Sequence, residues 1–370
     1  MKFSINKAEI LKELNALQGV VEKKNTIPIL SNILIEATDA STIAFLATDL
    51  DISLQTVCAA DVATPGAVVV QAKKLFDIVR NLPDAEIHFL KEDNDWVKIL
   101  CGSSEFKIVG QSKENFPSTT MAENYDTTLS ASVMNNLIQR TIYAITQEES
   151  RYALNGAMFV TDVDKLEMVA TDGHRLALAS VAHEQNQVAE KKSFIIPKKA
   201  LSEILKLTTG VEEPMEFATD ENHLYFKIGA RRFTSRKLAG QFPNYELVIP
   251  KNNDKAVPLN TERIAQAIKR AALMADERSH SVKFEFEKSK LNITSQSADV
   301  GELRETIPID YTDASVFIGF NAQYLLDFFN VVSSDEVVIE FKDEQSPALI
   351  RPAKDEGCDY RYIVMPMRLM

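Results

Sequence analysis

The sequence predicts an α+β protein made of three copies of one module, in which helices cover antiparallel sheets. The first observation is a segment that occurs three times: VQAKKLFDIVR at 70–80, IPKKALSEILK at 196–206 and FNAQYLLDFFN at 320–330. In each copy a leucine is followed two residues later by an acidic residue and then by two apolar residues. The copies start 126 residues (196 − 70) and 124 residues (320 − 196) apart, which indicates repeated domains rather than a solenoid.

Two further sets of segments repeat in the same way. INKAEILKEL, LSASVMNNLI and LNTERIAQAI begin at residues 5, 129 and 259, and ATDLDISL at 47 matches ATDGHRLAL at 170. Polar, turn-rich seams lie near 115–127 and 250–256. We therefore expect three domains, at residues 1–125, 126–252 and 253–370.

Each copy contains the periodicities of helices and of strands. Apolar residues recur at helical spacing, as in Leu201, Ile204 and Leu205, whereas VKILCG and KLEMVAT are typical of strands. Most of the expected elements are strands joined by turns, and only a few are helices. This pattern favours antiparallel sheets with the helices on one side. Two helices per copy are expected, with spans of 7–24, 72–81, 131–147, 197–207, 260–274 and 321–332.

The composition bounds the class of protein. Apolar residues make up 45% and charged residues 25% of the 370 residues, which allows several cores. No stretch is long and apolar enough to cross a bilayer, and MKFSINKAEILKEL at the start lacks the apolar region of a signal peptide. Cys58, Cys101 and Cys358 lie far apart without a CxxC motif, which disfavours zinc and a disulfide scaffold. We expect a reduced, cytoplasmic protein.

The net charge of −12 disfavours nucleic-acid binding, but the charge is unevenly distributed. Each of the helices at 72–81, 197–207 and 260–274 carries +2, so the rest of the chain carries −18 (−12 − 6). On the first two helices, basic residues occupy matched positions opposite the core-facing leucine. These residues are Lys73 and Arg80 in one copy and Lys199 and Lys206 in the next.

Two interpretations of these basic faces remain open. They are either solvent-exposed faces with i,i+4 ion pairs, such as Lys73–Asp77 and Lys199–Glu203, or surfaces that face phosphates. Their modest charge and the lack of a base-reading module would make phosphate contact weak and independent of sequence.

The TDLD segment at 48–51 and the TDGH segment at 171–174 could suggest metal-binding carboxylates. A two-metal nuclease needs several carboxylates converging on metals about 3.5–4 Å apart. We favour a structural turn in which the aspartate bonds to nearby backbone. The sequence contains no GxSxG, HExxH, Walker or GxGxxG motif, so we predict no catalytic residue, no metal and no nucleotide cofactor.

Four segments carry a resemblance to a known family: TDGHRLAL at 171–178, FPNYELVIP at 242–250, FNAQYLLDF at 320–328 and MPMRL at 365–369. With the three repeats, they make the whole chain closely resemble the beta subunit of bacterial DNA polymerase III, the DNA sliding clamp. The resemblance implies a non-catalytic processivity subunit. In that family each domain has two helices backed by sheets, and two subunits close head-to-tail into a homodimeric ring around double-stranded DNA.

The resemblance also implies a peptide-binding pocket walled by the C-terminal strand. Short linear motifs of the replicative polymerase catalytic subunit, the clamp loader, translesion polymerases and repair proteins insert there. Methionines suit such a site because their flexible side chains repack around different peptides. Carried over by position, the pocket comprises Leu154, Thr171, Gly173, His174, Arg175, Leu176, Pro243, Val248, Asn321, Tyr324, Ser346, Ile363, Val364, Met365, Pro366, Met367, Arg368 and Leu369.

Two other surfaces follow from the resemblance. The dimer interface would join copy one of one subunit, at Phe106 and Ile108, to copy three of the other, at Ala272 and Leu273. This chain departs from the family where Leu247 replaces an arginine. DNA-contacting positions would be Lys24, Lys73, Glu148, Tyr152 and Ala153, to which the helical-face argument adds Lys199, Lys206 and Arg270.

Three functional hypotheses follow. The chain is a DNA-encircling scaffold that docks motif peptides, a metal-dependent nuclease, or a peptide-binding hub with no role on DNA. The first is the favoured hypothesis because it accounts for the repeats, the charge distribution and the apolar C-terminus together.

Overall fold

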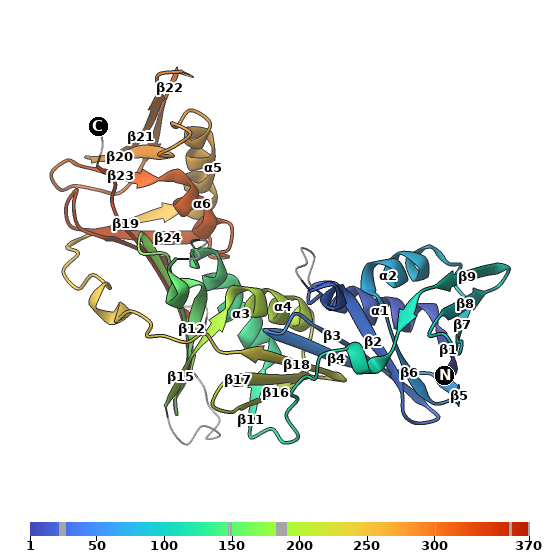
Figure 1. Cartoon of the computed structure of the whole chain (residues 1–370). Helices are drawn as coiled ribbons and strands as arrows, with labels where there is room; N and C mark the ends of the chain where they lie inside the picture. Colours follow the sequence, from blue (N-terminus) through green and yellow to red (C-terminus); the bar gives the residue numbers. More distant parts are fainter. Residues whose placement is uncertain are drawn as a thin grey trace. The chain divides into compact units, whose positions relative to one another are not determined.

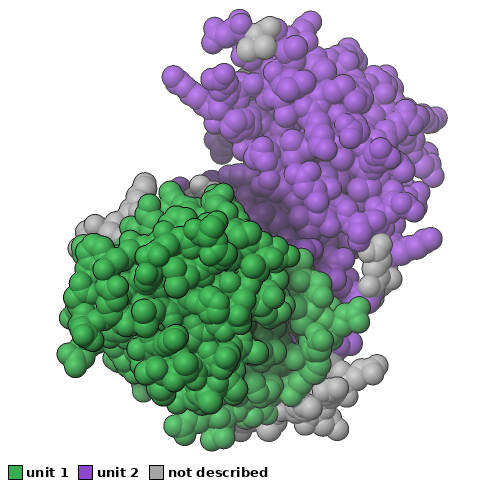
Figure 2. All heavy atoms as spheres, turned by 90° about the vertical axis from the view of Figure 1, so that its right-hand side faces the viewer, with its two compact units in different colours: residues 1–135, 202–237 green, residues 136–201, 238–370 purple. Residues whose placement is uncertain are grey.

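The computed structural model describes residues 1–21, 27–146, 148, 150–182, 191–299, 301–354 and 357–368 (Figure 1). The chain divides into two compact units (Figure 2). Unit 1 contains Met1–Asn135 and Ser202–Lys237, and unit 2 contains Asn136–Leu201 and Leu238–Met370. The middle of the chain therefore contributes to both units.

Unit 1 contains two antiparallel sheets. Along the five-stranded sheet the order is β5 (Asp61–Thr64), β1 (Lys2–Asn6), β7 (Glu86–Lys91), β8 (Val97–Cys101) and β9 (Ser104–Ile108). Along the nine-stranded sheet it is β10 (Gly110–Gln111), β6 (Gly66–Gln71), β2 (Asn32–Ala37), β3 (Thr42–Thr48), β4 (Ile52–Ala59), β18 (Arg231–Arg236), β17 (His223–Ile228), β16 (Pro214–Thr219) and β11 (Thr127–Ser130).

Unit 2 also contains two antiparallel sheets. Along the eight-stranded sheet the order is β15 (Lys192–Pro197), β12 (Gly156–Thr161), β13 (Lys165–Thr171), β14 (Arg175–Ala182), β26 (Asp359–Val364), β25 (Ala348–Pro352), β24 (Glu336–Phe341) and β19 (Lys255–Asn260). Along the four-stranded sheet it is β22 (Gly301–Pro308), β21 (Lys290–Ser297), β20 (Ser281–Glu287) and β23 (Val316–Asn321).

The helices of the described residues pack beside these sheets, as the predicted α+β class requires (Figure 1). They are α1 (Lys7–Leu17), α2 (Ala72–Asn81), α3 (Ala131–Thr141), α4 (Lys198–Thr208), α5 (Thr261–Ala272) and α6 (Ala322–Phe329). Helix α1 contacts α2 in unit 1, and α5 contacts α6 in unit 2. The side chains of Asn6, Asn260 and Asn321 cap the first turns of α1, α5 and α6 by accepting backbone N–H bonds.

Four helices of the described residues end earlier than predicted. Helix α1 ends at Leu17 rather than at 24, α3 at Thr141 rather than at 147, α5 at Ala272 rather than at 274, and α6 at Phe329 rather than at 332. Beyond α1, α3 and α6 the sequence contains glycine or β-branched residues, which have low helix propensity. Residues 22–24 of the first predicted helix lie outside the described residues.

Each unit joins strands from successive copies of the module. In unit 1, β4 pairs with β18, and in unit 2, β14 pairs with β26. An arginine reinforces each junction: Arg231, which is half-buried, donates to both carboxylate oxygens of Glu13 on α1, and the buried Arg175 donates to Asp327 on α6. The two junctions are therefore equivalent places in the repeat, and each one carries a recess.

Candidate functional site

A recess of about 120 Å³ lies in unit 2, where β14 and β26 meet. Nine of its ten lining residues belong to the pocket predicted from the sequence; the tenth, Tyr245, does not. The lining residues are Leu154, Thr171, Gly173, Arg175, Leu176, Pro243, Tyr245, Val248, Ile363 and Met365. The structure thus brings together residues from four separate parts of the sequence.

The strand register makes the floor of this pocket apolar. Leu176 on β14 pairs with Ile363 on β26, which pairs in turn with Leu349 on β25. Directly paired residues share one face of a sheet, so the three buried side chains form a continuous apolar row. Phe242 and Tyr245, from the segment that follows residue 237, pack against the same cluster.

Tyr245 is the lining residue that the sequence prediction missed. Its hydroxyl donates to Glu167, which also accepts from Lys165 at 3.0 Å. Burial, together with the hydrogen bond to Glu167, raises the pKa of Tyr245, so the phenol stays neutral. Its place inside FPNYELVIP, a segment already singled out, is the signal that could have indicated it.

A tight turn forms the edge of the pocket next to β14. Thr171 Oγ1 donates to the carbonyl of Arg175 at 2.6 Å and accepts from the N–H of Gly173 at 3.1 Å. Gly173 has φ +88°, a conformation that favours glycine. The carboxylate of Asp172 accepts from the backbone N–H groups of His174 and Arg175. The predicted structural turn is confirmed.

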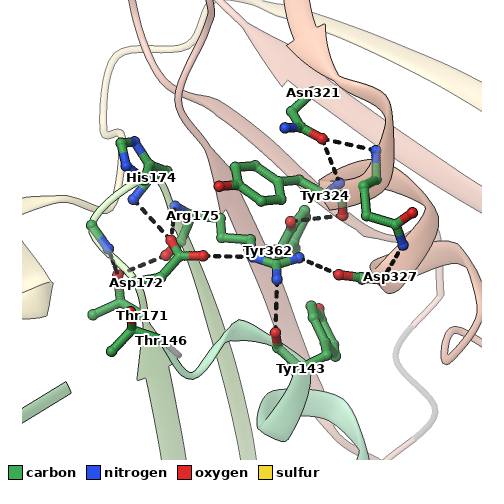
Figure 3. A network of polar contacts seen from close by, with 12 residues as sticks. Tyr143, Thr146, Thr171, Asp172, His174, Arg175, Asn321, Tyr324, Asp327 and Tyr362 are labelled. Carbon is green, nitrogen blue, oxygen red and sulfur yellow. Dashed lines mark hydrogen bonds and ion pairs between the residues drawn. The ribbon is translucent and has the colours of Figure 1, made fainter. Parts of the chain in front are cut away.

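Arg175 fixes this turn to helix α6 (Figure 3). Its guanidinium donates to Asp172 at 3.0 Å and to Asp327 at 2.6 Å, and also to the carbonyl of Tyr143 at 2.7 Å. It lies 4.3 Å from the ring centroid of Tyr324, and its side chain is only 8% exposed. Burial alone would lower the pKa of Arg175, but Tyr362 and Asp327 outweigh it, so the pKa is raised and the cation persists.

Several other predicted pocket residues lie around the recess without lining it. His174 stacks near the ring of Tyr324, and Asn321 caps α6. Val364 pairs with Arg175 and so lies on the opposite face of the sheet from Leu176. Ser346 lines a different recess, beside Phe317.

The C-terminal segment continues past the pocket. The N–H of Met365 donates to the carbonyl of His174 at 2.9 Å, and the N–H of Met367 donates to the carbonyl of Gly319 at 2.8 Å. Pro366 is half-buried and Arg368 is exposed, whereas Leu369 lies outside the described residues. The apolar C-terminal segment is therefore held by backbone bonds at least as far as Met367.

The predicted basic faces of α2 and α4 point to solvent. Lys73 and Lys206 are exposed, while Leu75 and Leu201 are fully buried. In the structure, Asp77 pairs with Arg80 at 3.3 Å, and Glu203 pairs with Lys206 at 2.7 Å. Both pairs join residues that are three apart, whereas the pairs suggested from the sequence join residues that are four apart. Lys199 is exposed as well.

The remaining residues predicted to contact DNA differ in their ion pairs and in their exposure. Arg270 donates to both carboxylate oxygens of Glu305, whose hydrogen bond raises the pKa of Arg270. Glu148 pairs with Arg151 at 3.1 Å. Tyr152 is 56% exposed, whereas Ala153 packs against the pocket cluster. Lys24 lies outside the described residues.

The predicted interface residues occur at an edge strand and at a helix end. Phe106 is 39% exposed on β9, the outer strand of the five-stranded sheet, and Ile108 is half-buried there. Ala272 is half-buried at the end of α5, and Leu273 beside it is 73% exposed. Unpaired edges and exposed apolar side chains of this kind are usually covered in an assembly.

Among the described residues, no group of three or more His, Cys, Asp or Glu side chains is placed to hold a metal ion. Cys58, Cys101 and Cys358 are buried. Among the helices in the described ranges, none is long and apolar enough to span a membrane.

Three repeated modules of helices on antiparallel sheets, with an apolar pocket beside the last strand, define a clamp-type processivity protein. The chain matches three family models in order: DNA polymerase III beta subunit, N-terminal domain over residues 1–121, central domain over 128–244 and C-terminal domain over 246–368. The chain therefore belongs to the DNA polymerase III beta subunit family, the beta sliding clamps, which are processivity subunits rather than enzymes.

Relatives and solved structures agree over the full length. The chain is 33% identical to the beta sliding clamp of Pseudomonas putida over 371 residues and 35% identical to that of Caulobacter vibrioides over 378 residues, covering 100% of both chains in each case. The structure of a Pseudomonas aeruginosa sliding clamp superposes with a TM-score of 0.92 at 32% identity, again over 100% of both chains. Another P. aeruginosa clamp structure, with griselimycin bound, gives a TM-score of 0.93. The predicted family and fold are confirmed.

Proposed function

We propose that two copies of this chain close into a ring around double-stranded DNA and that the unit 2 pocket docks short linear motifs. The proposed partners are the catalytic subunit of the replicative polymerase, the clamp loader, translesion polymerases and repair proteins, all in the cytoplasm. The observation that carries the proposal is the apolar pocket in a chain that matches the family from end to end. The domain boundaries after residues 125 and 252 belong to the same proposal.

The chemistry of the pocket suits an apolar peptide side chain. Leu176 and Ile363 form a buried floor, while Val248 and Met365 are about two-fifths exposed at the rim. Burying a leucine or phenylalanine side chain there would contribute about 1.5–3 kcal/mol. Because Arg175 is held by Asp172 and Asp327, the floor is already ordered before a peptide arrives. Pre-ordering lowers the entropic cost of binding.

The charge distribution supports weak contact with DNA phosphates. Lys73 and Arg80 on α2, and Lys199 and Lys206 on α4, are exposed. Copy three places the neutral Gln323 on α6 and Asn330 at its C-cap in the matching positions. A few exposed cations give affinity that falls steeply with salt and carries no sequence information. A ring needs this property, because tight binding would stop it from sliding.

One experiment tests the ring directly. The protein is loaded by a clamp loader onto nicked circular DNA, the circle is isolated at fixed salt, and the DNA is then linearised. A ring is retained on the circle and released on linearisation. Protein that stays bound to linear DNA would contradict topological linkage, and protein never retained on the circle would favour the peptide-binding hub.

A Leu273→Glu variant, designed to prevent dimerisation, provides the matched control for the loading experiment. Leu273 is exposed, so the substitution leaves the fold of the chain intact but places a charge in the proposed interface. The variant should run as a monomer by sedimentation and should not be retained on circular DNA. A Leu273→Glu protein that remains dimeric would refute the interface assignment.

A further inference from the structure

Unit 1 contains a second recess at the equivalent junction, where β4 meets β18. It has a volume of about 290 Å³ and is lined mainly by polar side chains. Its lining residues are Thr48, Leu50, Asp51, Ser53, Ser118, Thr119, Thr120, His223, Thr234 and Arg236. All of them belong to unit 1 and to the described residues.

The turn at this recess repeats the turn at the unit 2 pocket. Thr48 Oγ1 donates to the carbonyl of Ile52 at 3.0 Å and accepts from the N–H of Leu50 at 3.0 Å. These are the bonds that Thr171 makes in unit 2. Even the unusual backbone conformation is kept, since Leu50 has φ +81° where Gly173 has φ +88°.

The strand that closes each junction is held in the same way. The N–H of Arg236 donates to the carbonyl of Asp51 at 2.8 Å, as the N–H of Met365 donates to the carbonyl of His174 at 2.9 Å. Arg236 therefore occupies at the unit 1 recess the position that Met365 occupies at the unit 2 pocket. The backbone of one site is a copy of the other.

The floor of the unit 1 recess is polar instead of apolar. Ser53 pairs with Thr234 across the junction, at the register position where Leu176 pairs with Ile363 in unit 2. Ser53 Oγ donates to Thr48 Oγ1 at 2.9 Å, and Thr234 Oγ1 donates to the carbonyl of Thr120 at 2.9 Å. Both hydroxyl hydrogens are used within the protein, which leaves oxygen lone pairs as acceptors for a ligand N–H.

The rim supplies a cation that is weakly engaged. The guanidinium of Arg236 lies 3.9 Å from the carboxylate of Asp51, and the two side chains are 60% and 73% exposed. An exposed pair at this separation contributes little and is readily exchanged for a better partner. A carboxylate that accepts two parallel N–H bonds from the guanidinium is such a partner.

We propose that the unit 1 recess binds an extended peptide segment with an acidic side chain, whose carboxylate pairs with Arg236. The floor oxygens of Ser53 and Thr234 accept backbone N–H bonds from the same segment, and the hydroxyls of Ser118 and Thr119 line its path. Acceptors beside a single cation match a peptide that carries one carboxylate. A phosphate dianion fits less well than a carboxylate, because the Asp51 carboxylate near Arg236 would repel a double negative charge more strongly than a single one.

Panning and binding measurements test this inference. A phage-displayed random heptapeptide library is panned on the full-length protein, and selected peptides are labelled with fluorescein for anisotropy titrations. The decisive variant is Arg236→Met, which installs the unit 2 residue in unit 1. Met365→Ala serves as the matched variant at the other site. Arg236→Lys keeps the charge without the two parallel donors, and circular dichroism melting verifies that each variant is folded.

The expected result is a class of acidic peptides that bind about tenfold more weakly to Arg236→Met and equally well to Met365→Ala. Replacing the key Glu by Gln should cause a similar loss, and Arg236→Lys should fall between. The inference is overturned if no peptide depends on Arg236, if the Gln peptide binds equally well, or if acetate or inorganic phosphate at the peptide's concentration displaces it. Motif peptides of the unit 2 pocket should be unaffected by Arg236→Met, so the two proposals can fail separately.

Discussion

The two recesses share a backbone but differ in their chemistry. Each lies at the junction between successive copies, behind a turn in which threonine bonds the same two backbone groups. In unit 2 the paired floor residues are Leu176 and Ile363, and in unit 1 they are Ser53 and Thr234. The repeated turn and strand pairing therefore place a recess at each junction, and the paired floor side chains make one recess apolar and the other polar.

The difference is confined to the junction itself. Farther along the same sheet face both units remain apolar, with Leu34, Leu46 and Val69 in unit 1 and Val169 and Ile195 in unit 2. A phenylalanine near the end of each of the first two modules, Phe116 or Phe242, packs against this apolar surface. The polar floor in unit 1 is thus a local feature and does not reflect a generally polar core.

The largest expected effect concerns the arginine that follows the turn. Arg175 occupies in unit 2 the place of Ile52 in unit 1, and replacing it with methionine leaves Asp172 and Asp327 without their buried cation. We expect Arg175→Met to lower the free energy of unfolding of unit 2 by about 3–5 kcal/mol. Urea unfolding followed by far-UV circular dichroism measures the change.

Arg361→Met provides the control for that prediction. Arg361 pairs with Asp359 at 2.7 Å on the neighbouring strand, but both side chains are 40% or more exposed. Its loss should cost under about 1 kcal/mol. Equal effects of the two substitutions would show that the network around Arg175 does not stabilise the pocket.

The next prediction concerns an exchange of floor residues between the two recesses. Ile363→Thr gives the unit 2 pocket the hydroxyl that Thr234 supplies in unit 1, and it should weaken binding of a polymerase motif peptide about tenfold because apolar contact is lost. Thr234→Ile, the reciprocal change, should leave that affinity unchanged. Fluorescence anisotropy of the labelled peptide measures both. If the Ile363→Thr protein is folded and binds the peptide normally, the floor of the pocket does not contribute to peptide binding.

Sequence reasoning could predict the module, its helices and most of the pocket, because repeats and motifs are local patterns. It could not show that Ser346 lies in another recess, since that depends on how the loop around Asp343 folds. Nor could it choose Arg80 over Lys73 as the partner of Asp77, which depends on rotamers. The polar recess could not be predicted either, although the two ATD segments match. It depends on which strands of different copies pair, and neither segment alone determines that pairing.

Substitutions at the positive-φ position of the two turns should change stability in opposite directions. Gly173→Ala places a side chain at φ +88°, where its Cβ would lie 2.8 Å from a guanidinium nitrogen of Arg151, and should destabilise unit 2 by about 1–2 kcal/mol. Leu50→Gly relieves the same conformation in unit 1 and should stabilise it by up to about 1 kcal/mol, part of the gain being offset by chain entropy. Thermal unfolding of the two variants measures the signs. Destabilisation by Leu50→Gly would show that the Leu50 side chain contributes packing at the rim.

Acid should weaken the unit 1 junction through Glu13. Burial raises the pKa of Glu13, but hydrogen bonds from Arg231 and Thr56 outweigh it and lower the pKa below 4.5. A lowered folded-state pKa means that the stabilisation is complete above 4.5 and is lost as pH falls through the folded-state value. Fluorescence of Trp96, the only tryptophan in the sequence and part of unit 1, follows urea unfolding between about pH 6 and about pH 3. Glu13→Gln should flatten this dependence, and an unchanged slope would exclude Glu13 as its source.

The smallest expected effect is on the salt dependence of DNA binding, and it is tested by comparing the second helices of copies one and three. Lys73 is exposed on α2, while Gln323 occupies the matching place on α6. If the α2 face contacts phosphates, Lys73→Ala should lower the slope of log affinity for short duplex DNA against log salt by about 0.9, whereas Gln323→Ala should leave it unchanged. The affinity should fall by a similar factor for unrelated duplex sequences, because a phosphate contact reads no base. A loss that depends on sequence, or equal slopes for wild type and Lys73→Ala, would show that the α2 face is a solvent-exposed surface and that its charge has no part in holding DNA.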